Sequence, residues 1–266
     1  MAINPVSLAA VFGGEKSIGD MVKGFDFSKM DVKDDTRNDH LHLDLAPSYG
    51  PEGKLTSAAI KCMDDNLKIM IAGTMKSLSA LKPEDRSWAN IMSTLMQNPL
   101  LEPETDAISR SDKLIKSGTN VFKFDGSPDA TIVNEVQAWF VGLISDKDVL
   151  DSTKIDIHVL GEIVAQTGAT VDSFETFFGK KERHEKTIVD IGVLRFPDQD
   201  RPHFQVYRIQ LHAWSQSNRV LFVQEDTNGI TGEYYSRNFK PRDSVIVGLR
   251  AETKQKAIQQ AEDMFA

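Results

Sequence analysis

The chain has 266 residues, carries a net charge of -8 at pH 7 and has an isoelectric point near 5.3. Its longest basic cluster is Lys180–His184, so it lacks the grouped Lys and Arg that bind phosphates, and no nucleic-acid partner is expected. Met1–Val6 has no basic residue ahead of its apolar ones, and no apolar run approaches the roughly 20 residues of a membrane-spanning helix. We therefore expect a protein made in soluble form without a Sec signal peptide, so that any membrane role would require its conversion.

The beginning of the chain predicts short elements. Asn4 and Pro5 favour a helix start, because Asn suits the N-cap and Pro the first helical position. Residues 1–38 are expected to form a helical extension within one domain that covers residues 1–266, with the polar stretch Met30–Asn38 as a loop. Leucines then alternate with polar residues over Asp39–Leu45, which predicts a strand with one polar face.

Two helical hairpins are predicted by apolar residues that recur every three or four positions. The first joins Leu55–Leu81 to Glu84–Asn98, and the single cysteine, Cys62, is expected to be a buried thiol within it. The second joins a helix from Ser127 to Ser145, with Ser127 as its cap and Pro128 at its first position, to a helical stretch over Ile155–Val164. Between the hairpins, Leu100–Gly118 is expected to be irregular and Asn120–Asp125 to be a short strand.

The densest strand signals follow the second hairpin. Runs rich in β-branched and aromatic residues, bounded by turn residues, predict antiparallel strands over Thr187–Phe196, Phe204–Trp214, Arg219–Gln224 and Tyr234–Phe239. Thr187–Phe196 has apolar residues on both sides, as a strand buried on both faces requires. With an amphipathic C-terminal helix over Ala251–Ala266, the sequence predicts a three-layer α/β/α fold. Its central sheet is mainly antiparallel, with one helical hairpin on each side.

Phe177–Glu182, then a polar break, then the strands Ile188–Phe196, Phe204–Leu211 and Val220–Phe222 follow one another in a recognisable order. This order resembles one helix and three strands of the cytolytic delta-endotoxin fold, which volvatoxin and the Erwinia virulence factor share. In those toxins an aromatic pair with Gly-Lys precedes the first strand and Val-Leu-Phe-Phe marks the third; here Val223 replaces the second Phe. Residues 1–120 match only in the order of their elements.

The resemblance implies a membrane-active toxin or virulence factor that carries out no enzymatic reaction and needs no cofactor. Its partner would be membrane lipid, with a homo-oligomer on the membrane as an open alternative. In this hypothesis the helices swing away from the sheet and present their aromatic stripes to lipid, although core packing is the ordinary interpretation of such stripes. Alternatively, Thr187–Phe196 and Phe204–Trp214 insert, since each is long enough for a tilted transmembrane strand. The candidate lipid-binding residues are Trp139, Phe140, Leu143, Phe174, Phe177 and Phe178.

Two other functions stay open. His40, His42 and Asp44 share one face of the predicted strand Asp39–Leu45, and these are metal-ligand types found in metal-dependent hydrolases. The leucine alternation explains the same pattern without a metal, as the polar face of an edge strand. The third alternative is a non-catalytic binding module whose apolar stripes never leave the core.

Overall fold

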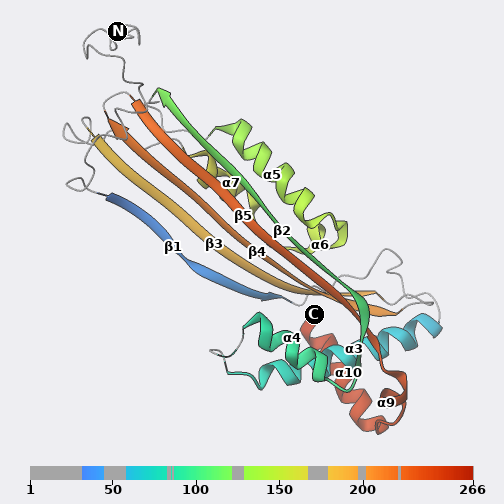
Figure 1. Cartoon of the computed structure of the whole chain (residues 1–266). Coiled ribbons are helices and arrows are strands. Elements are labelled where there is room, and N and C mark those ends of the chain that lie inside the picture. Colours follow the sequence, from blue (N-terminus) through green and yellow to red (C-terminus); the bar gives the residue numbers. More distant parts are fainter. Residues whose placement is uncertain are drawn as a thin grey trace, which may run out of the picture.

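The structure is a computed structural model, and it describes residues 32–44, 58–82, 85, 87–121, 129–166, 179–196, 202–220 and 223–265. Its centre is a five-stranded sheet in the order β1-β3-β4-β5-β2. The strands are long and lie side by side, running diagonally across the view in Figure 1. They are β1 (Val32–Asp44), β2 (Leu101–Val121), β3 (Gly179–Phe196), β4 (His203–Val220) and β5 (Val223–Pro241).

The sheet is mainly antiparallel, as the sequence predicts. β3, β4 and β5 follow one another as an antiparallel meander, from Phe196↔His203 at one turn to Val220↔Val223 at the next. β2 joins β5 antiparallel, whereas β1 joins β3 in parallel. The two edge strands therefore come from the first half of the chain and enclose a sheet centre that comes from the second half.

One face of the sheet is covered by α5 (Ala130–Ile144), α6 (Lys147–Ser152) and α7 (Ile157–Ala165) (Figure 1). Alternate residues of the strands meet these helices, because successive side chains of a strand point to opposite faces. The buried cluster that results contains Val136, Phe140, Leu143, Ile144, Leu160 and Val164 from the helices, and Ile188, Leu194, Tyr207, Ile209, Leu211, Ala213, Ile230 and Tyr234 from the strands.

The other helices gather at one end of the strands: α3 (Ala58–Ser79), α4 (Trp88–Gln97), α9 (Asp243–Val247) and α10 (Ala251–Phe265) (Figure 1). They form a second core with the opposite sheet face, through Ile191, Val193, Phe204, Val206 and Phe239. β3 thus contributes to both cores, which confirms the prediction of a strand buried on both sides. Further along β4 on this second face, Arg208, Gln210 and His212 are only partly buried.

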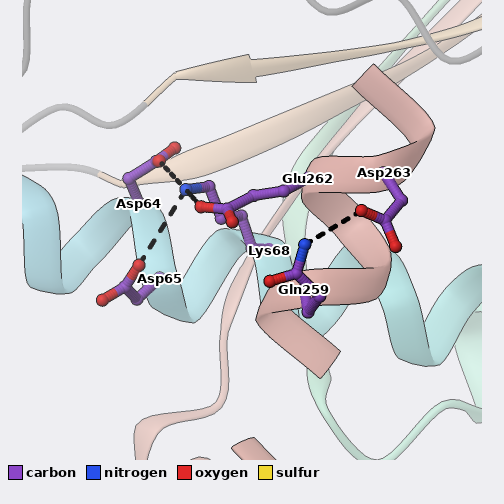
Figure 2. Close-up of polar contacts among 6 residues, drawn as sticks. All are labelled: Asp64, Asp65, Lys68, Gln259, Glu262 and Asp263. Atoms are coloured by element: carbon purple, nitrogen blue, oxygen red, sulfur yellow. Dashed lines mark hydrogen bonds and ion pairs between the residues drawn. The ribbon is translucent and has the colours of Figure 1, made fainter. Parts of the chain in front are cut away.

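A polar cluster joins α3 to α10 inside this second group of helices (Figure 2). Lys68 Nζ lies 3.1 Å from Asp64 Oδ2 and 2.8 Å from Glu262 Oε1, and Asp65 Oδ1 is 4.0 Å away. Burial alone would lower the pKa of Lys68, but its bonds to Glu262 and Asp64 outweigh burial and raise that pKa above 10.5. The ammonium is therefore held charged between the two helices.

Several predicted elements are wrong in their type or bounds. Leu100–Gly118, expected to be irregular, is most of β2, and Met30–Asn38, expected to be a loop, overlaps β1. Arg219–Gln224 is not a strand of its own, since it spans the end of β4 and the beginning of β5. The stretches in β1 and β2 are rich in polar residues, and residues 106–113 of β2 are exposed, so the apolar alternation that marks a half-buried strand is weak in them.

The helices are closer to expectation. The second hairpin is present as α5 and α7, with the short α6 between them, and α10 is the predicted C-terminal helix. The cap of α5 is Asp129 rather than Ser127, because the Asp129 carboxylate accepts the hydrogen bond from Thr131 N at 2.9 Å. Cys62 is exposed, so the predicted buried thiol is wrong: it lies on the outer side of α3 near its beginning. Of the helical extension predicted over residues 1–38, residues 1–31 lie outside the described residues, and residues 32–38 belong to the strand β1 instead.

Candidate membrane-binding layer

The α5–α7 layer, residues 130–165, has the composition expected of helices with an apolar surface. Glu135 is the one charged residue of α5, and Glu162 is the one carboxylate of α7, which has no Lys or Arg. The large apolar side chains of both helices gather on the side that faces the sheet. Gly161 of α7 allows the two helices to approach closely, since a Cβ there would lie 3.3 Å from Val133 Cα of α5.

Each helix of the layer begins at an aspartate, because a carboxylate at the N-cap accepts bonds from backbone N–H groups that have no partner within the helix. Asp129 accepts from Thr131 N. Asp146 accepts from Asp148 N and Val149 N at 3.1 and 3.3 Å, and Asp156 from His158 N and Val159 N at 3.1 and 3.4 Å. The layer is thus divided into three helical segments by residues that the sequence supplies locally.

Three of the predicted lipid-binding residues lie in α5. Phe140 and Leu143 are 4% and 3% exposed, and both pack into the core beneath the layer. Trp139 is partly buried, and its indole Nε1 donates to Asp112 Oδ2 of β2 at 3.1 Å. Phe174, Phe177 and Phe178 lie outside the described residues. Of the six predicted lipid-binding residues, the three in α5 are therefore the ones that the structure places together.

Polar side chains of β2 hold the outer side of the layer to the sheet. Arg110 Nη1 donates to Leu143 O at 3.2 Å and to Ile144 O at 2.6 Å, which satisfies carbonyls at the end of α5. Lys116 forms an ion pair with Glu135, and Asp112 accepts the bond from Trp139. Each contact joins α5 to the edge strand rather than to the centre of the sheet.

A second group of polar contacts reaches the central strands. Asp146 Oδ2 accepts from Gln205 Nε2 at 2.9 Å and from Tyr234 OH at 3.4 Å. Thr153 Oγ1 donates to Asp190 Oδ2 at 2.5 Å, and Asn228 Nδ2 donates to Val164 O at 2.8 Å. Burial beneath the layer raises the pKa of Tyr234 to about 12, and the Asp146 carboxylate adds to the rise, so the phenol stays a donor.

The sheet face under the layer carries buried polar side chains as well as apolar ones. Toward the β4–β5 turn it carries side chains that are buried and polar: Ser215, Ser217, Asp226 and Asn228. Ser217 Oγ donates to Asp226 Oδ1 at 2.6 Å. Asp190 and Gln205 are also buried on this face. Because of these polar side chains, the strands would be less well suited to a hydrocarbon environment than the apolar side of α5 and α7.

The alternative metal ligands lie on β1. The parallel register places His40 across from Ile188, His42 across from Asp190 and Asp44 across from Gly192. No group of three or more metal-ligating side chains is found within the described part of the chain. β1 is an edge strand, as the alternative interpretation of its polar face requires.

Sequence reasoning missed the residues that attach the layer to the sheet. Arg110, Asp112 and Lys116 lie in the stretch that was expected to be irregular, and Asp146 and Asp190 belong to no motif. Their partners in the layer or the sheet are distant along the chain, from 19 positions for Lys116–Glu135 to 88 for Tyr234–Asp146. The one local signal is the aspartate before each helix, which marks a cap and does not reveal a contact with the sheet.

No family model and no curated protein matches this chain. Among solved structures, one described as "Structure of the Evf virulence factor" matches with a TM-score of 0.22 and 10% identity, over 88% of this chain and 80% of that one. This is a distant structural neighbour, and a TM-score at this level does not establish a common fold. Among the described helices, none is both long and apolar enough to cross a membrane.

Proposed function

We propose that this protein binds membranes through the α5–α7 layer, which leaves the sheet when it meets a lipid surface. The observation that carries this proposal is that the layer's apolar contacts and its polar contacts with the sheet lie in different places. Its apolar side chains are buried against the sheet, while its polar contacts with the sheet form a small group near its edges and ends. Phe140 and Leu143 would then contact lipid, with Trp139 at the interface.

The helices are better suited to lipid than the strands beneath them. Releasing the strands into hydrocarbon would bring Asp190, Gln205 and Asn228 with them, and buried polar groups without partners are costly there. The apolar side of α5, by contrast, presents Val136, Phe140 and Leu143 with no charged residue among them. We therefore favour helices that lie in the interfacial plane over strand insertion. Bilayer disruption, and the toxin or virulence role, would follow from this binding.

The energy of exposure explains why release would require lipid. Fully exposing a large apolar side chain to water costs roughly 1.5–3 kcal/mol. The layer contributes seven such side chains to its core, namely Val136, Phe140, Leu143, Ile144, Val149, Leu160 and Val164. The sheet face would be exposed as well. A bilayer accepts the helix side chains and removes that cost, so the layer stays closed in water and opens at a membrane.

A disulfide between α5 and β5 tests the proposal. A Cβ added at Gly232 lies 2.5 Å from Leu143 Cδ2 and 2.7 Å from the Trp139 ring, so α5 and β5 are in direct contact here, and Gly232→Cys is combined with Leu143→Cys to join them. The exposed Cys62 is first replaced by Ser to remove competing thiol chemistry. We expect the oxidised protein to bind and permeabilise phosphatidylcholine vesicles at least tenfold less than the same protein after reduction, as measured by flotation and dye release.

The matched control joins the two helices to each other instead of to the sheet. Val133→Cys with Gly161→Cys connects α5 to α7, whose backbones approach closely at these positions. Because the layer would still be free to leave as one unit, oxidation of this variant should not reduce vesicle binding. Equal activity of the α5–β5 variant in both redox states would show that the layer does not move.

The lipid composition separates apolar insertion from simple charge attraction. The net charge of -8 opposes adsorption to anionic lipid, so binding should survive moderate salt on vesicles with and without phosphatidylglycerol. A wild-type protein that binds neither kind of vesicle, from acid to alkaline pH, would contradict the membrane function itself.

A further inference from the structure

β2 presents a long open edge. Among the described strands it pairs with β5 alone, and residues 106–113 are exposed one after another. Ile108 is 39% exposed and Ile115 is 51% exposed on the same strand. An edge of this length offers backbone N–H and C=O groups to another strand, and proteins ordinarily protect such edges. Lys113 and Lys116 are charged residues of the kind that protect an edge strand from pairing with unrelated strands.

We propose that the partner of this edge is a second copy of the same chain, paired β2 to β2 in antiparallel orientation about a twofold axis at Ser111. In this register Asp106 lies across from Lys116 and Arg110 across from Asp112, each occurring twice by symmetry. Ile108 lies across from Leu114, and Ala107 across from Ile115. Opposite charges and apolar pairs directly across two strands are the pairs that stabilise a sheet.

Neighbouring registers do not have this complementarity. A twofold axis through Ser109 sets Asp106 against Asp112, and one through Arg110 sets two guanidinium groups against each other. An axis through Asp112 opposes two carboxylates, and one through Lys113 opposes Arg110 and Lys116. Like charges directly across a pair are unfavourable. These like-charge contacts therefore disfavour the four registers centred on Ser109, Arg110, Asp112 and Lys113 relative to the one centred on Ser111.

Alternate side chains of this edge lie on the side of the sheet that carries α5. Arg110, Asp112 and Lys116 all contact that helix. Arg110 donates through Nη1 to the carbonyls of Leu143 and Ile144, and a guanidinium has further donors for a carboxylate of the second copy. On α5, Glu135 and Trp139 face β2, and helical spacing places Ala138 and Gly142 beside them.

The two α5 helices of the pair would then lie next to each other on one face of a continuous sheet. Ala138 and Gly142 are exposed, and a Cβ added at Gly142 would meet nothing within 4 Å. No bulky side chain at these positions prevents the approach. The proposed pairing goes beyond the membrane function and does not depend on it, because it forms in water between folded chains.

Two charge reversals test the register. Asp106→Lys and Lys116→Asp each place like charges across the strands twice, so each variant alone should dimerise at least tenfold more weakly than wild type by analytical ultracentrifugation. An equimolar mixture should form heterodimers with near-wild-type affinity, because both pairs are then opposite in charge again. A purely structural effect of either substitution would not be rescued by mixing.

The matched control is Lys113→Asp, which makes the same charge change on the same strand. Lys113 lies across from Ser109 in the proposed register, so this variant should dimerise as wild type does. Circular dichroism of every variant establishes that the fold is retained. A control that weakens the dimer as strongly as Lys116→Asp would overturn the register.

Cross-linking tests the axis directly. In a Cys62→Ser background, Ser111→Cys faces its own copy at the short Cα separation of an antiparallel pair, and mild oxidation should give a covalent dimer. Ser109→Cys faces Lys113 of the second copy, so its two thiols are four residues apart along the strands and should not cross-link. A wild-type protein that stays monomeric at high concentration, or equal cross-linking at both positions, would overturn the proposal.

Discussion

Tyr234 is the residue that most directly connects the layer to solution pH. Its phenol is buried, and burial raises its pKa from 10.0 to about 12. The folded state therefore holds this proton more tightly than the unfolded state. As pH rises from 10 toward 12, the unfolded chain loses its proton first and gains stability, so the free energy of unfolding falls.

Tyr234→Phe should remove this dependence. We expect the wild-type free energy of unfolding to fall by about 2 kcal/mol more than that of the variant between pH 10 and 12, as measured by urea titration. Lys68 also has a raised pKa and loses its stabilising charge at high pH, but it does so in both proteins. Parallel pH curves for the two proteins would contradict the assigned burial.

The Lys68 cluster gives a second prediction at this scale. Lys68→Met leaves the Asp64 carboxylate, whose side chain is 1% exposed, without its ammonium partner. Breaking a buried pair by removing one member strands the other charge, so we expect a loss of about 3 kcal/mol in the free energy of unfolding. Lys256→Met is the matched control, because its pair with Glu252 is exposed and should contribute less than about 0.5 kcal/mol. Similar losses in the two variants would show that the Lys68 cluster is solvated.

β3 is the element on which both cores depend. Ile188 and Leu194 meet the α5–α7 layer, while Ile191 and Val193 meet the helices at the other face. Ile191→Asp places a carboxylate where the side chain is 2% exposed, and should cost about 4 kcal/mol or more. Val247→Asp in α9 is the control, since Val247 is 74% exposed and its replacement should be nearly neutral in thermal unfolding. Near-wild-type stability of Ile191→Asp would mean that this face of β3 is open to water.

The sequence predicts well those elements whose burial produces a regular spacing of apolar residues. α5, α7 and α10 alternate buried and exposed sides every three to four residues, and the centre of β3 is apolar throughout, so each is predicted from local pattern. β2 has no such pattern, since an exposed edge strand needs neither face to be apolar. Its 21 residues are held by pairing with β5, which no local signal reveals.

At the scale of the whole molecule, some residues of the candidate layer are predicted from local sequence pattern, and others acquire their role from contacts with distant parts of the chain. Phe140 and Leu143 are predicted from helical spacing, because their neighbours along the helix determine which way they face. Arg110, Asp146 and Asp190 are not, since each acquires its role from a strand or helix that the chain reaches much later or earlier. The local pattern thus identifies the apolar residues of the layer, whereas its polar contacts with the sheet are seen only in the folded structure.

The strand order also determines when each strand can pair during synthesis of the chain. β1 and β2 leave the ribosome before β3, β4 and β5, yet each pairs only with a strand of that later group among the described elements. The pairing Leu101↔Pro241 closes a very long stretch of chain, whereas Val220↔Val223 closes a tight turn. Because local contacts form faster than distant ones, the meander is the natural folding nucleus and the edges add last. β1 has no strand partner among the described elements until β3 is made, and β2 has none until β5 is made near the end of synthesis. In that interval their unpaired edges make the nascent chain most prone to aggregation.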